Sequence, residues 1–201
     1  MNYLGSRKLE TKRLELRPQT FVEQKRLWEI LMMPEVHQTF LTISKKYGEN
    51  LKDWTIQEPI YKKKTAHAND PDVFEWSIFL NGTNTCIGKI GFHEAKIEFE
   101  EQTDKTVRGM GWYIDPNYQG NGYAYEAAKG ALDYMFNKVK ISAIQTSTGK
   151  DNPKSWASME KLGFINRGKT IFVDHTFVDE PTEQIVYGLT KQEYSELKKT
   201  R

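Results

Sequence analysis

The spacing of apolar side chains in the first third of the chain predicts a strand followed by helices. Residues 9–16 alternate partly between apolar and polar side chains, as a strand does. Residues 20–33 instead carry apolar side chains at helical spacing. Thr20 and Glu23 have the arrangement of a capping box at the start of this helix, and Pro34 helps to end it. A further helical region is expected over residues 49–64.

The middle of the chain has the pattern of strands. Residues 73–80 and 85–93 are expected to pair through the turn at Asn81 and Gly82, a strong hairpin signal. A charged segment follows, and residues 107–114 form a third expected strand. Residues 123–136 are expected to be helical, and their alanines lie on one face. Such a face lets a helix approach a sheet closely.

The last third predicts strand and helix in alternation. Residues 141–148 have a strand pattern. Asn152 and Pro153 then supply an N-cap residue and a first-turn proline for a helix that Gly163 ends. Two strands over residues 164–178 and 184–190 and a short helix from Gln192 complete the chain. This order predicts a single domain over residues 1–201 of the mixed α/β (α+β) class, a sandwich rather than a doubly wound parallel sheet.

Composition narrows the class of partners. The 29 basic residues nearly balance the 27 acidic ones, for a net charge of +2, which is no electrostatic footprint for nucleic acid. The runs at residues 62–64 and 98–101 are expected to be solvated faces. The sequence has no apolar run of about 20 residues, the N-terminus lacks a signal-peptide core, and the single cysteine, Cys86, cannot form an internal disulfide. We therefore expect a cytoplasmic protein without a membrane or nucleic-acid partner.

Two glycine motifs suggest nucleotide binding but lack the required context. Residues 163–170 match the P-loop pattern GxxxxGK[ST], yet a P-loop follows a strand and opens a helix. Here a capped helix precedes the glycine, and β-branched and aromatic residues typical of a strand follow it. Gly120 and Gly122 could begin a dinucleotide fingerprint, but the third glycine would fall at Tyr125. Neither interpretation is retained.

The same pair of glycines fits another kind of site. Strand 107–114 leads through residues 115–118 to Gly120 and Gly122, and a helix follows. Two glycines one residue apart let successive backbone N–H groups turn inward, which makes an anion nest at a helix N-terminus. The pyrophosphate of a coenzyme would suit this nest. An ordinary glycine-rich turn has the same spacing, so the motif alone leaves both interpretations open.

Three sequence blocks resemble one family. Residues 111–126, GWYIDPNYQGNGYAYE, resemble the acetyl-CoA signature Q/R-x-x-G-x-G/A of the GNAT superfamily. Asn152 and Ser155, followed by residues 159–164, resemble the N-x-x-S…K-x-G-F segment of the branch that contains ribosomal-protein N-terminal (alanine) acetyltransferases. Residues 9–18 are similar to the opening strand of that branch. The blocks stand in the family order and frame nearly the whole chain.

The resemblance implies a fold and a cosubstrate. The GNAT fold is a three-layer sandwich in which a mostly antiparallel sheet splays, here between strands 107–114 and 141–148, with the pantetheine of acetyl-CoA in the gap. The implied acetyl-CoA contacts are the backbones of Trp112, Tyr113 and Ile114, the loop residues Gln119, Gly120, Asn121, Gly122, Tyr123 and Ala124, and, near the thioester, Asn152 and Ser155. An N-cap residue and a surface serine of a helix would also explain the last two.

The implied reaction is transfer of the acetyl group to a primary amine by direct attack on the thioester, without a metal. Ser155 is the candidate proton donor to the sulfur, on resemblance. Many relatives carry a glutamate base where this chain has Gly109, which leaves His93, Glu94, Glu75 or a water chain as the base.

The missing glutamate bears on the acceptor. An α-amine with a pKa of about 7.8 is roughly a quarter neutral at physiological pH, whereas a lysine near 10.4 is neutral at about one part in a thousand. An enzyme without a strong base is therefore expected to cope better with α-amines, such as the N-terminus of a protein or peptide, or with other amines of low pKa.

Other functions stay open. A small amine such as an aminoglycoside, a polyamine or an amino-acid derivative is the enzymatic alternative, and Gly109 also suits a non-catalytic acyl-CoA-binding regulatory module. The aromatic residues expected near the acceptor are Trp28, Trp54, Tyr61 and Trp76. A monomer or a homodimer is expected.

Overall fold

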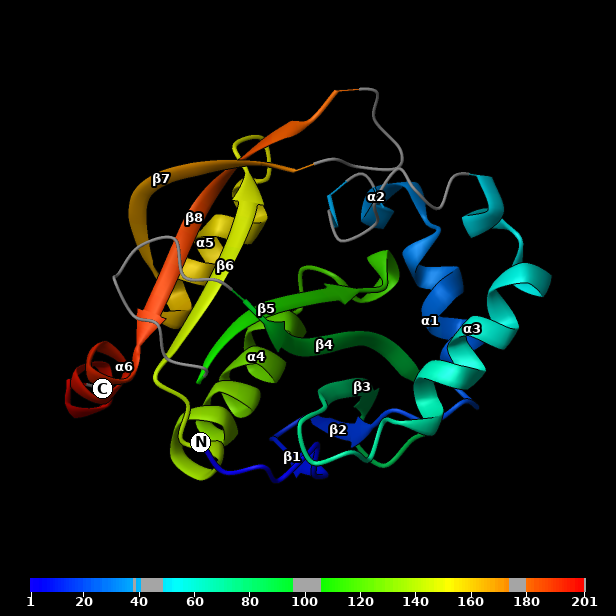
Figure 1. Ribbon diagram of the computed structural model, residues 1–201, viewed down its shortest axis with the longest axis horizontal. Coiled ribbons are helices and arrows are strands. Elements are labelled where there is room, and N and C mark those ends of the chain that lie inside the picture. The colour runs from blue at the N-terminus through cyan, green and yellow to red at the C-terminus, as the bar shows by residue number, and fades with distance from the viewer. Residues whose placement is uncertain (38, 41–48, 96–105, 174–179, 201) are drawn as a thin grey trace.

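The described part of the chain forms an eight-stranded sheet in the order β1-β2-β3-β4-β5-β6-β8-β7 (Figure 1). The computed structural model describes residues 1–37, 39–40, 49–95, 106–173 and 180–200. β5 and β6 pair in parallel, and the other neighbouring strands pair antiparallel. The expected class, a mixed and mostly antiparallel sheet flanked by helices, is confirmed.

The first expected strand is in fact a short hairpin. The two strands are β1 (Leu9–Glu10) and β2 (Leu14–Pro18), and they pair antiparallel. Between them the Thr11 hydroxyl accepts a hydrogen bond from the Leu14 amide at 3.1 Å, which closes the turn. The prediction of one continuous strand over residues 9–16 was wrong, because the alternation of apolar side chains does not report a reversal of the chain.

In the described part of the chain between residues 19 and 73, four helical segments follow β2. They are α1 (Gln24–Leu31), α2 (Pro34–His37), η2 (Glu49–Lys52) and α3 (Trp54–Ala66). α1 begins at Gln24, later than expected. The Glu23 carboxylate accepts a hydrogen bond from the Thr20 amide at 2.6 Å, as in a capping box, but it also accepts one from the buried Ser77 hydroxyl at 2.9 Å. Pro34 opens α2 as well as following α1. The helix expected over residues 49–64 is confirmed as η2 and α3, and Asp53 caps α3.

The three central strands lie where the sequence places them. They are β3 (Phe74–Leu80), β4 (Cys86–Glu94) and β5 (Val107–Ile114). Gly82, in the turn between β3 and β4, has a φ of +70°. The acidic run at residues 98–101 lies outside the described residues.

The last third alternates as expected, except that residues 174–178 of the strand predicted over 164–178 lie outside the described residues. Its elements are η3 (Pro116–Tyr118), α4 (Tyr123–Tyr134), the π-helical turn η4 (Met135–Val139), β6 (Ala143–Gly149), α5 (Pro153–Leu162), β7 (Ile165–Val173), β8 (Thr182–Thr190) and α6 (Lys191–Lys199). Gly163 ends α5 with a φ of +99°, and β7 follows. The P-loop match at residues 163–170 is therefore a helix end followed by a strand.

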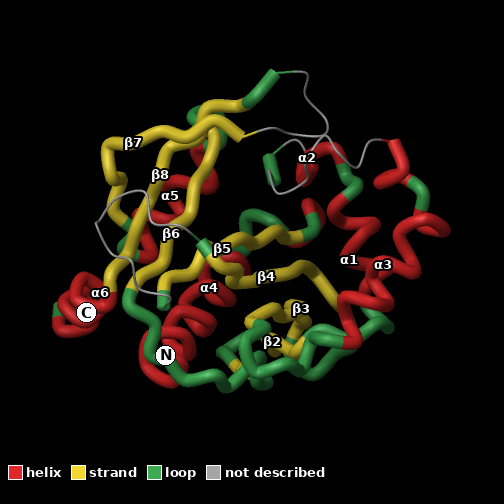
Figure 2. Tube along the Cα trace, viewed as in Figure 1, coloured by secondary structure: helices red, strands yellow, loops and turns green. Residues whose placement is uncertain are grey.

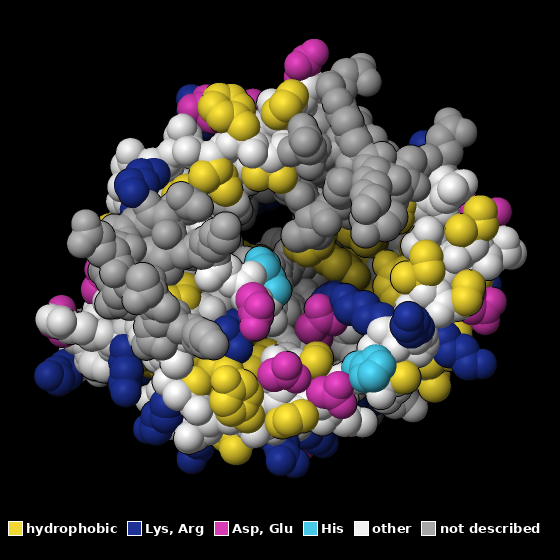
Figure 3. All heavy atoms as spheres, in the orientation of Figure 1, with side chains coloured by type: hydrophobic (Ala, Val, Ile, Leu, Met, Phe, Trp, Pro, Cys, Tyr) yellow, Lys and Arg dark blue, Asp and Glu magenta, His cyan; other side chains and the backbone are white. Residues whose placement is uncertain are grey.

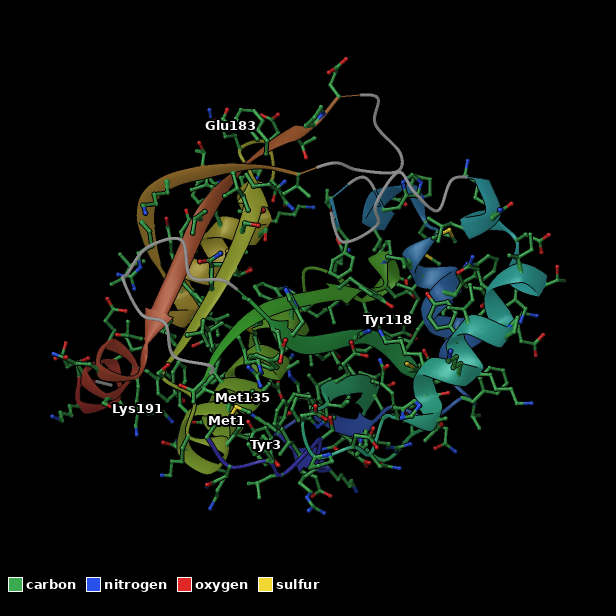
Figure 4. The ribbon with its side chains drawn as sticks, viewed as in Figure 1. Met1, Tyr3, Tyr118, Met135, Glu183 and Lys191 are labelled. Carbon is green, nitrogen blue, oxygen red and sulfur yellow. The ribbon has the colours of Figure 1, made fainter. Side chains whose placement is uncertain are left out.

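Helices cover the sheet on both faces (Figure 2). α4 and α5 pack against the larger core cluster, whereas α1 and α2 form a second cluster with Phe79, Cys86 and Tyr113. The N-terminal residues hold the end of α4: the Tyr134 hydroxyl donates to the Gly5 carbonyl at 2.8 Å, and Met1, labelled in Figure 4, packs against the larger core cluster, to which Met135 belongs. Among the residues that the structure describes, no helix has both the length and the apolar character of a membrane span.

Candidate active site

The sheet opens between β5 and β6. The two strands pair only from Val107–Ala143 to Gly109–Gln145, and at the point where they part the Thr146 hydroxyl donates to the Met110 carbonyl at 2.9 Å. Beyond it β5 leads to Tyr118, while β6 and β8 lead toward Glu183, on the other side of the opening (Figure 4). The splay expected from the family resemblance is therefore present.

The register of β5 determines which backbone groups face this opening. The Asp115 amide donates to Ile87 on β4 at 2.8 Å, and hydrogen-bonding direction alternates along an antiparallel pair. Tyr113 therefore directs its amide and carbonyl to β4, opposite Lys89. Trp112 and Ile114 direct theirs to the opening. Of the three backbones expected to pair with pantetheine, we keep Trp112 and Ile114 and leave out Tyr113.

The loop between η3 and α4 has the geometry of an anion nest. Gly120 and Gly122 have φ values of +79° and +76°, and no atom lies within 4 Å of the position of a β-carbon on Gly120. Gly122 caps α4 without a side-chain hydrogen bond, so the first amides of α4, at Tyr123 and Ala124, lack the side-chain acceptor that most helix caps supply. These amides and the helix dipole suit a phosphate group.

Polar side chains of this loop hold its shape. The side-chain amide of Gln119 donates through Nε2 to the Ile114 carbonyl at 2.9 Å, and the side-chain amide of Asn121 donates through Nδ2 to the Tyr118 carbonyl at 3.2 Å. Gln119 and Asn121 therefore contribute to the site through the conformation that they stabilise, together with their own backbone amides.

Arg13 braces the same loop from the β1–β2 turn. Its guanidinium donates to the Asn121 carbonyl at 2.9 Å and to the Glu126 carboxylate at 2.6 Å, and it lies 4.6 Å above the centre of the Tyr123 ring. Sequence analysis did not find this residue, although it lies within the block of residues 9–18. The contact joins positions 108 residues apart, which no local pattern reports.

Asn152 and Ser155 lie at the start of α5, immediately after β6. The Asn152 side chain accepts from the Ser155 amide at 3.3 Å, so Asn152 is the N-cap of the helix. Ser155 is half-buried at the third position of α5. This arrangement is compatible with both of the interpretations that the sequence left open.

A cleft lies on the face of the sheet that α1 covers. The Tyr113 hydroxyl donates to the Leu27 carbonyl of α1 at 3.2 Å, which fixes this face. At the centre of the cleft both β4 and β5 carry glycine, because Gly91 on β4 is opposite Gly111 on β5. The Phe40 ring packs over Gly111, 3.5 Å from the position that a β-carbon on this glycine would take. Figure 3 shows a hollow near the middle of the molecule, bordered by acidic, basic and histidine side chains.

The imidazole of His93 fills the space above Gly109. The two residues are cross-strand partners on β4 and β5, and a β-carbon on Gly109 would lie 2.2 Å from Nε2 of His93. Gly109 is also the last residue of β5 that pairs with β6, so the ring stands at the apex of the opening. Glu94, the next residue, points to the opposite face because side chains alternate along a strand.

The charges in this cleft separate the candidate bases. Partial burial lowers the pKa of His93 below its ordinary value; Glu75 opposes this shift, and Lys89 and Arg108 add to it. Burial alone would raise the pKa of Glu75, but the charges and hydrogen bonds of Lys89 and Lys64 outweigh it and lower the pKa. A carboxylate held in its ionised form in this way is a poor base, so His93 is the better candidate.

The aromatic residues expected near the acceptor divide into two groups. Trp76 has no exposed surface and donates to the Arg7 carbonyl at 2.7 Å, so it is a core residue. Trp28, Trp54 and Tyr61 form a row across α1 and α3, with ring centres 5.5 Å and 5.7 Å apart. Burial raises the pKa of Tyr61 to about 12, with a contribution from Glu75. This row borders the charged part of the cleft.

The comparisons with known proteins decide the family. Residues 13–165 match the acetyltransferase (GNAT) domain. The chain belongs to the GNAT acetyltransferase family. It is an N-acetyltransferase, and enzymes of this family use acetyl-CoA. The described residues contain no group of three or more histidine, cysteine, aspartate or glutamate side chains that could hold a metal ion.

Relatives of this acetyltransferase include an uncharacterized enzyme and one that is named for its acceptor. It is 31% identical to the uncharacterized N-acetyltransferase YnaD of Bacillus subtilis over 56% of this chain and 65% of YnaD. It is 39% identical to the spermidine N(1)-acetyltransferase of Escherichia coli over 28% of this chain and 30% of that enzyme. These matches span less than two thirds of either relative.

Solved structures share the fold of this acetyltransferase. A GNAT-family acetyltransferase from Bacillus anthracis superposes with a TM-score of 0.71 at 21% identity, covering 92% of this chain and 99% of that one. The ribosomal-protein-S5-alanine acetyltransferase of Vibrio fischeri gives 0.71 at 14% identity, covering 94% and 99%. At these identities the likeness establishes the fold alone.

Proposed function

We propose that this enzyme transfers the acetyl group of acetyl-CoA to the N-terminal α-amine of a protein or peptide, with His93 as the proton acceptor. The observation that carries the proposal is the position of the His93 ring over Gly109, at the apex of the opening between β5 and β6. Its lowered pKa keeps the imidazole neutral at pH 7, which a base requires.

The donor half of the site follows from the opening and the loop. The amides of residues 119–124 bind the pyrophosphate, and the exposed edge of β5 at Trp112 and Ile114 hydrogen-bonds the pantetheine. An amide on this edge also stabilises the oxyanion as the amine attacks, an interaction worth roughly 3 kcal/mol for one donor in other enzymes.

The acceptor half completes the reaction. The neutral amine attacks the thioester carbonyl carbon, the new C–N bond forms and the C–S bond breaks. His93 accepts the proton that the amine loses, and Ser155, at the start of α5, donates a proton to the leaving thiolate. Glu94 takes no part, because it lies on the opposite face of the sheet from His93.

The alternative acceptor is a small amine such as spermidine, which one relative acetylates by its name. A polyamine site would present unpaired carboxylates to its cationic substrate. In the described part of this cleft Glu75 is already paired with Lys64 and Lys89, which argues against a polyamine.

A side-by-side screen tests the proposal. Release of coenzyme A is measured with N-terminal peptides, with spermidine and with an aminoglycoside, for the wild-type enzyme and for His93→Gln. We expect peptides to be the preferred acceptors and the substitution to reduce their turnover. Turnover of spermidine alone would overturn the assignment of the acceptor. Binding of acetyl-CoA without turnover of any amine would instead support a regulatory module.

A further inference from the structure

A cluster of three charged residues borders the acceptor cleft, and the catalytic steps above do not use it. The carboxylate of Glu75 on β3 accepts from Nζ of Lys64 on α3 and from Nζ of Lys89 on β4, each at 3.1 Å. The side chains of Glu75 and Lys89 are 22% and 19% exposed, and that of Lys64 is 50% exposed. One carboxylate thus faces two ammonium groups, which leaves the cluster with one positive charge in excess.

The strand register places this cluster in line with the base. Lys89, Gly91 and His93 follow one another on the same face of β4, and Glu75 is opposite Gly91, its Cδ 3.7 Å from the β-carbon position of that glycine. Because Gly91 has no side chain, it does not obstruct the path from the cluster to the His93 imidazole. Two strand residues, about 7 Å, separate Gly91 from His93.

The same distance relates the first residues of an extended peptide, which advances by roughly 3.3–3.6 Å per residue. A peptide with its α-amine beside His93 therefore brings the side chain of its second or third residue to the cluster. Burial lowers the pKa of Lys89 to about 8 in spite of the opposing effect of Glu75. The Lys89 ammonium is thus incompletely compensated by Glu75, and a further anion beside it would be favourable.

We propose that Lys64, Glu75 and Lys89 form an anion-recognition subsite, and that the enzyme selects peptides with an acidic side chain at the second or third residue. This inference rests on the proposed function, because it takes the α-amine to lie at His93. It also gives Glu75 a defined role, which is to hold two ammonium groups together on one side of the cleft.

Matched peptides test the subsite. Acetylation is compared for Ala-Glu-Ala, Ala-Gln-Ala and Ala-Lys-Ala amides, and for the same series with the variable residue third. All of them present the same N-terminal alanine. In whichever series reaches the cluster, we expect kcat/KM to be about fivefold higher for glutamate than for glutamine, the size of one favourable charge pair near a surface, and lowest for lysine.

Two variants on one helix supply the control. Lys64→Gln removes an ammonium of the subsite, and Lys63→Gln removes the neighbouring charge of α3, an exposed residue outside the subsite. The preference for glutamate should fall toward unity in Lys64→Gln and persist in Lys63→Gln. Lys89→Met should also abolish the preference for glutamate. Because Lys64 is half-exposed, Lys64→Gln tests the subsite even if Lys89→Met fails to fold.

The outcomes separate the inference from the proposed function. If the wild-type enzyme acetylates all three peptides equally well, or if Lys64→Gln keeps the preference, the subsite is wrong and acetylation of N-terminal amines stands. If no peptide is acetylated and spermidine is, the proposed function is wrong and the subsite fails with it.

Discussion

The imidazole of His93 stands where a side chain on Gly109 would have to lie, with Nε2 2.2 Å from the position of a β-carbon on that glycine. The two residues face each other across β4 and β5. Many relatives carry a glutamate base at the position of Gly109. In this protein the glycine leaves room for a histidine from the neighbouring strand, and in our proposal this histidine replaces that base at nearly the same place in the cleft.

Replacement of His93 by glutamine should lower kcat/KM for an N-terminal peptide by about 100-fold at pH 7, the usual size of a lost general base. The matched control is Glu94→Gln, on the opposite face of the same strand, which should change kcat/KM less than about twofold.

The pH profile of the same variant gives a second readout. Glu75, Lys89 and Arg108 act on the pKa of His93, and the net effect with burial is a pKa below 6.5. As pH falls below that value the wild-type enzyme loses both a neutral imidazole and a neutral amine, so the slope of log kcat/KM approaches two. In His93→Gln it should remain one. An unchanged slope would exclude His93 as the base.

The exchange between strands can be tested by reversing it. Gly109→Ala should displace the imidazole and reduce activity as His93→Ala does. The double variant His93→Ala with Gly109→Glu restores the residue common in relatives and leaves space for it. We expect the double variant to be about tenfold more active than His93→Ala. Activity no higher than that of His93→Ala would show that position 109 does not reach the acceptor amine.

The contribution of Gly120 to acetyl-CoA binding can be measured separately from its contribution to the stability of the fold. Gly120→Ala places a β-carbon on a residue with a φ of +79°, which should cost about 1 kcal/mol of unfolding free energy. Gly82, with a φ of +70° and also no atom within 4 Å of a β-carbon, is the matched control in the β3–β4 turn. Both variants should lose similar stability in thermal unfolding, but only Gly120→Ala should raise KM for acetyl-CoA, by about tenfold.

Arg13 should affect acetyl-CoA binding through the loop that it braces. Arg13→Met removes the hydrogen bond to the Asn121 carbonyl and the ion pair with Glu126, and KM for acetyl-CoA should rise about fivefold. Arg17→Met is the control. Arg17 also forms an ion pair with a carboxylate, that of Glu15 at 2.9 Å, and its guanidinium also lies over an aromatic ring, 4.1 Å from the centre of Phe79, but it does not contact the loop. An equal rise in KM for both variants would indicate a general loss of stability.

The anion subsite should depend on pH in a defined direction. Lys89 attracts an anion while it is protonated, and burial lowers its pKa to about 8. The preference for glutamate over glutamine peptides should therefore be full below pH 7 and should decline as pH rises through about 8. Ratios of kcat/KM for the two peptides cancel the ionisation of the shared N-terminus. A ratio that stays constant to pH 9 would remove Lys89 from the subsite.

Much of the fold follows from local pattern. The hairpin at Asn81 and Gly82, the N-cap at Asn152 and the helix end at Gly163 all lie where the sequence predicts them, because each depends on the backbone preference of a few adjacent residues. The same kind of argument rejects the P-loop match. The β1–β2 reversal was missed because the alternation of apolar side chains does not report a turn, and the late start of α1 was missed because Ser77, distant in sequence, donates to Glu23.

The sequence by itself indicated the donor half of the site, through its resemblance to the GNAT family: the two glycines, the following helix and the strand before them are contiguous, so the family motif that they match can be recognised without the structure. The residues that we propose for the acceptor half come together only in the tertiary structure. His93 meets Gly109, and Glu75 meets Lys64 and Lys89, through strand register and helix packing. The pairing of the strands and the packing of α3 bring these charged groups together, and each group then shifts the pKa of its neighbours. Such a shift depends on the distance between the groups in space, which the order of residues along the chain does not give.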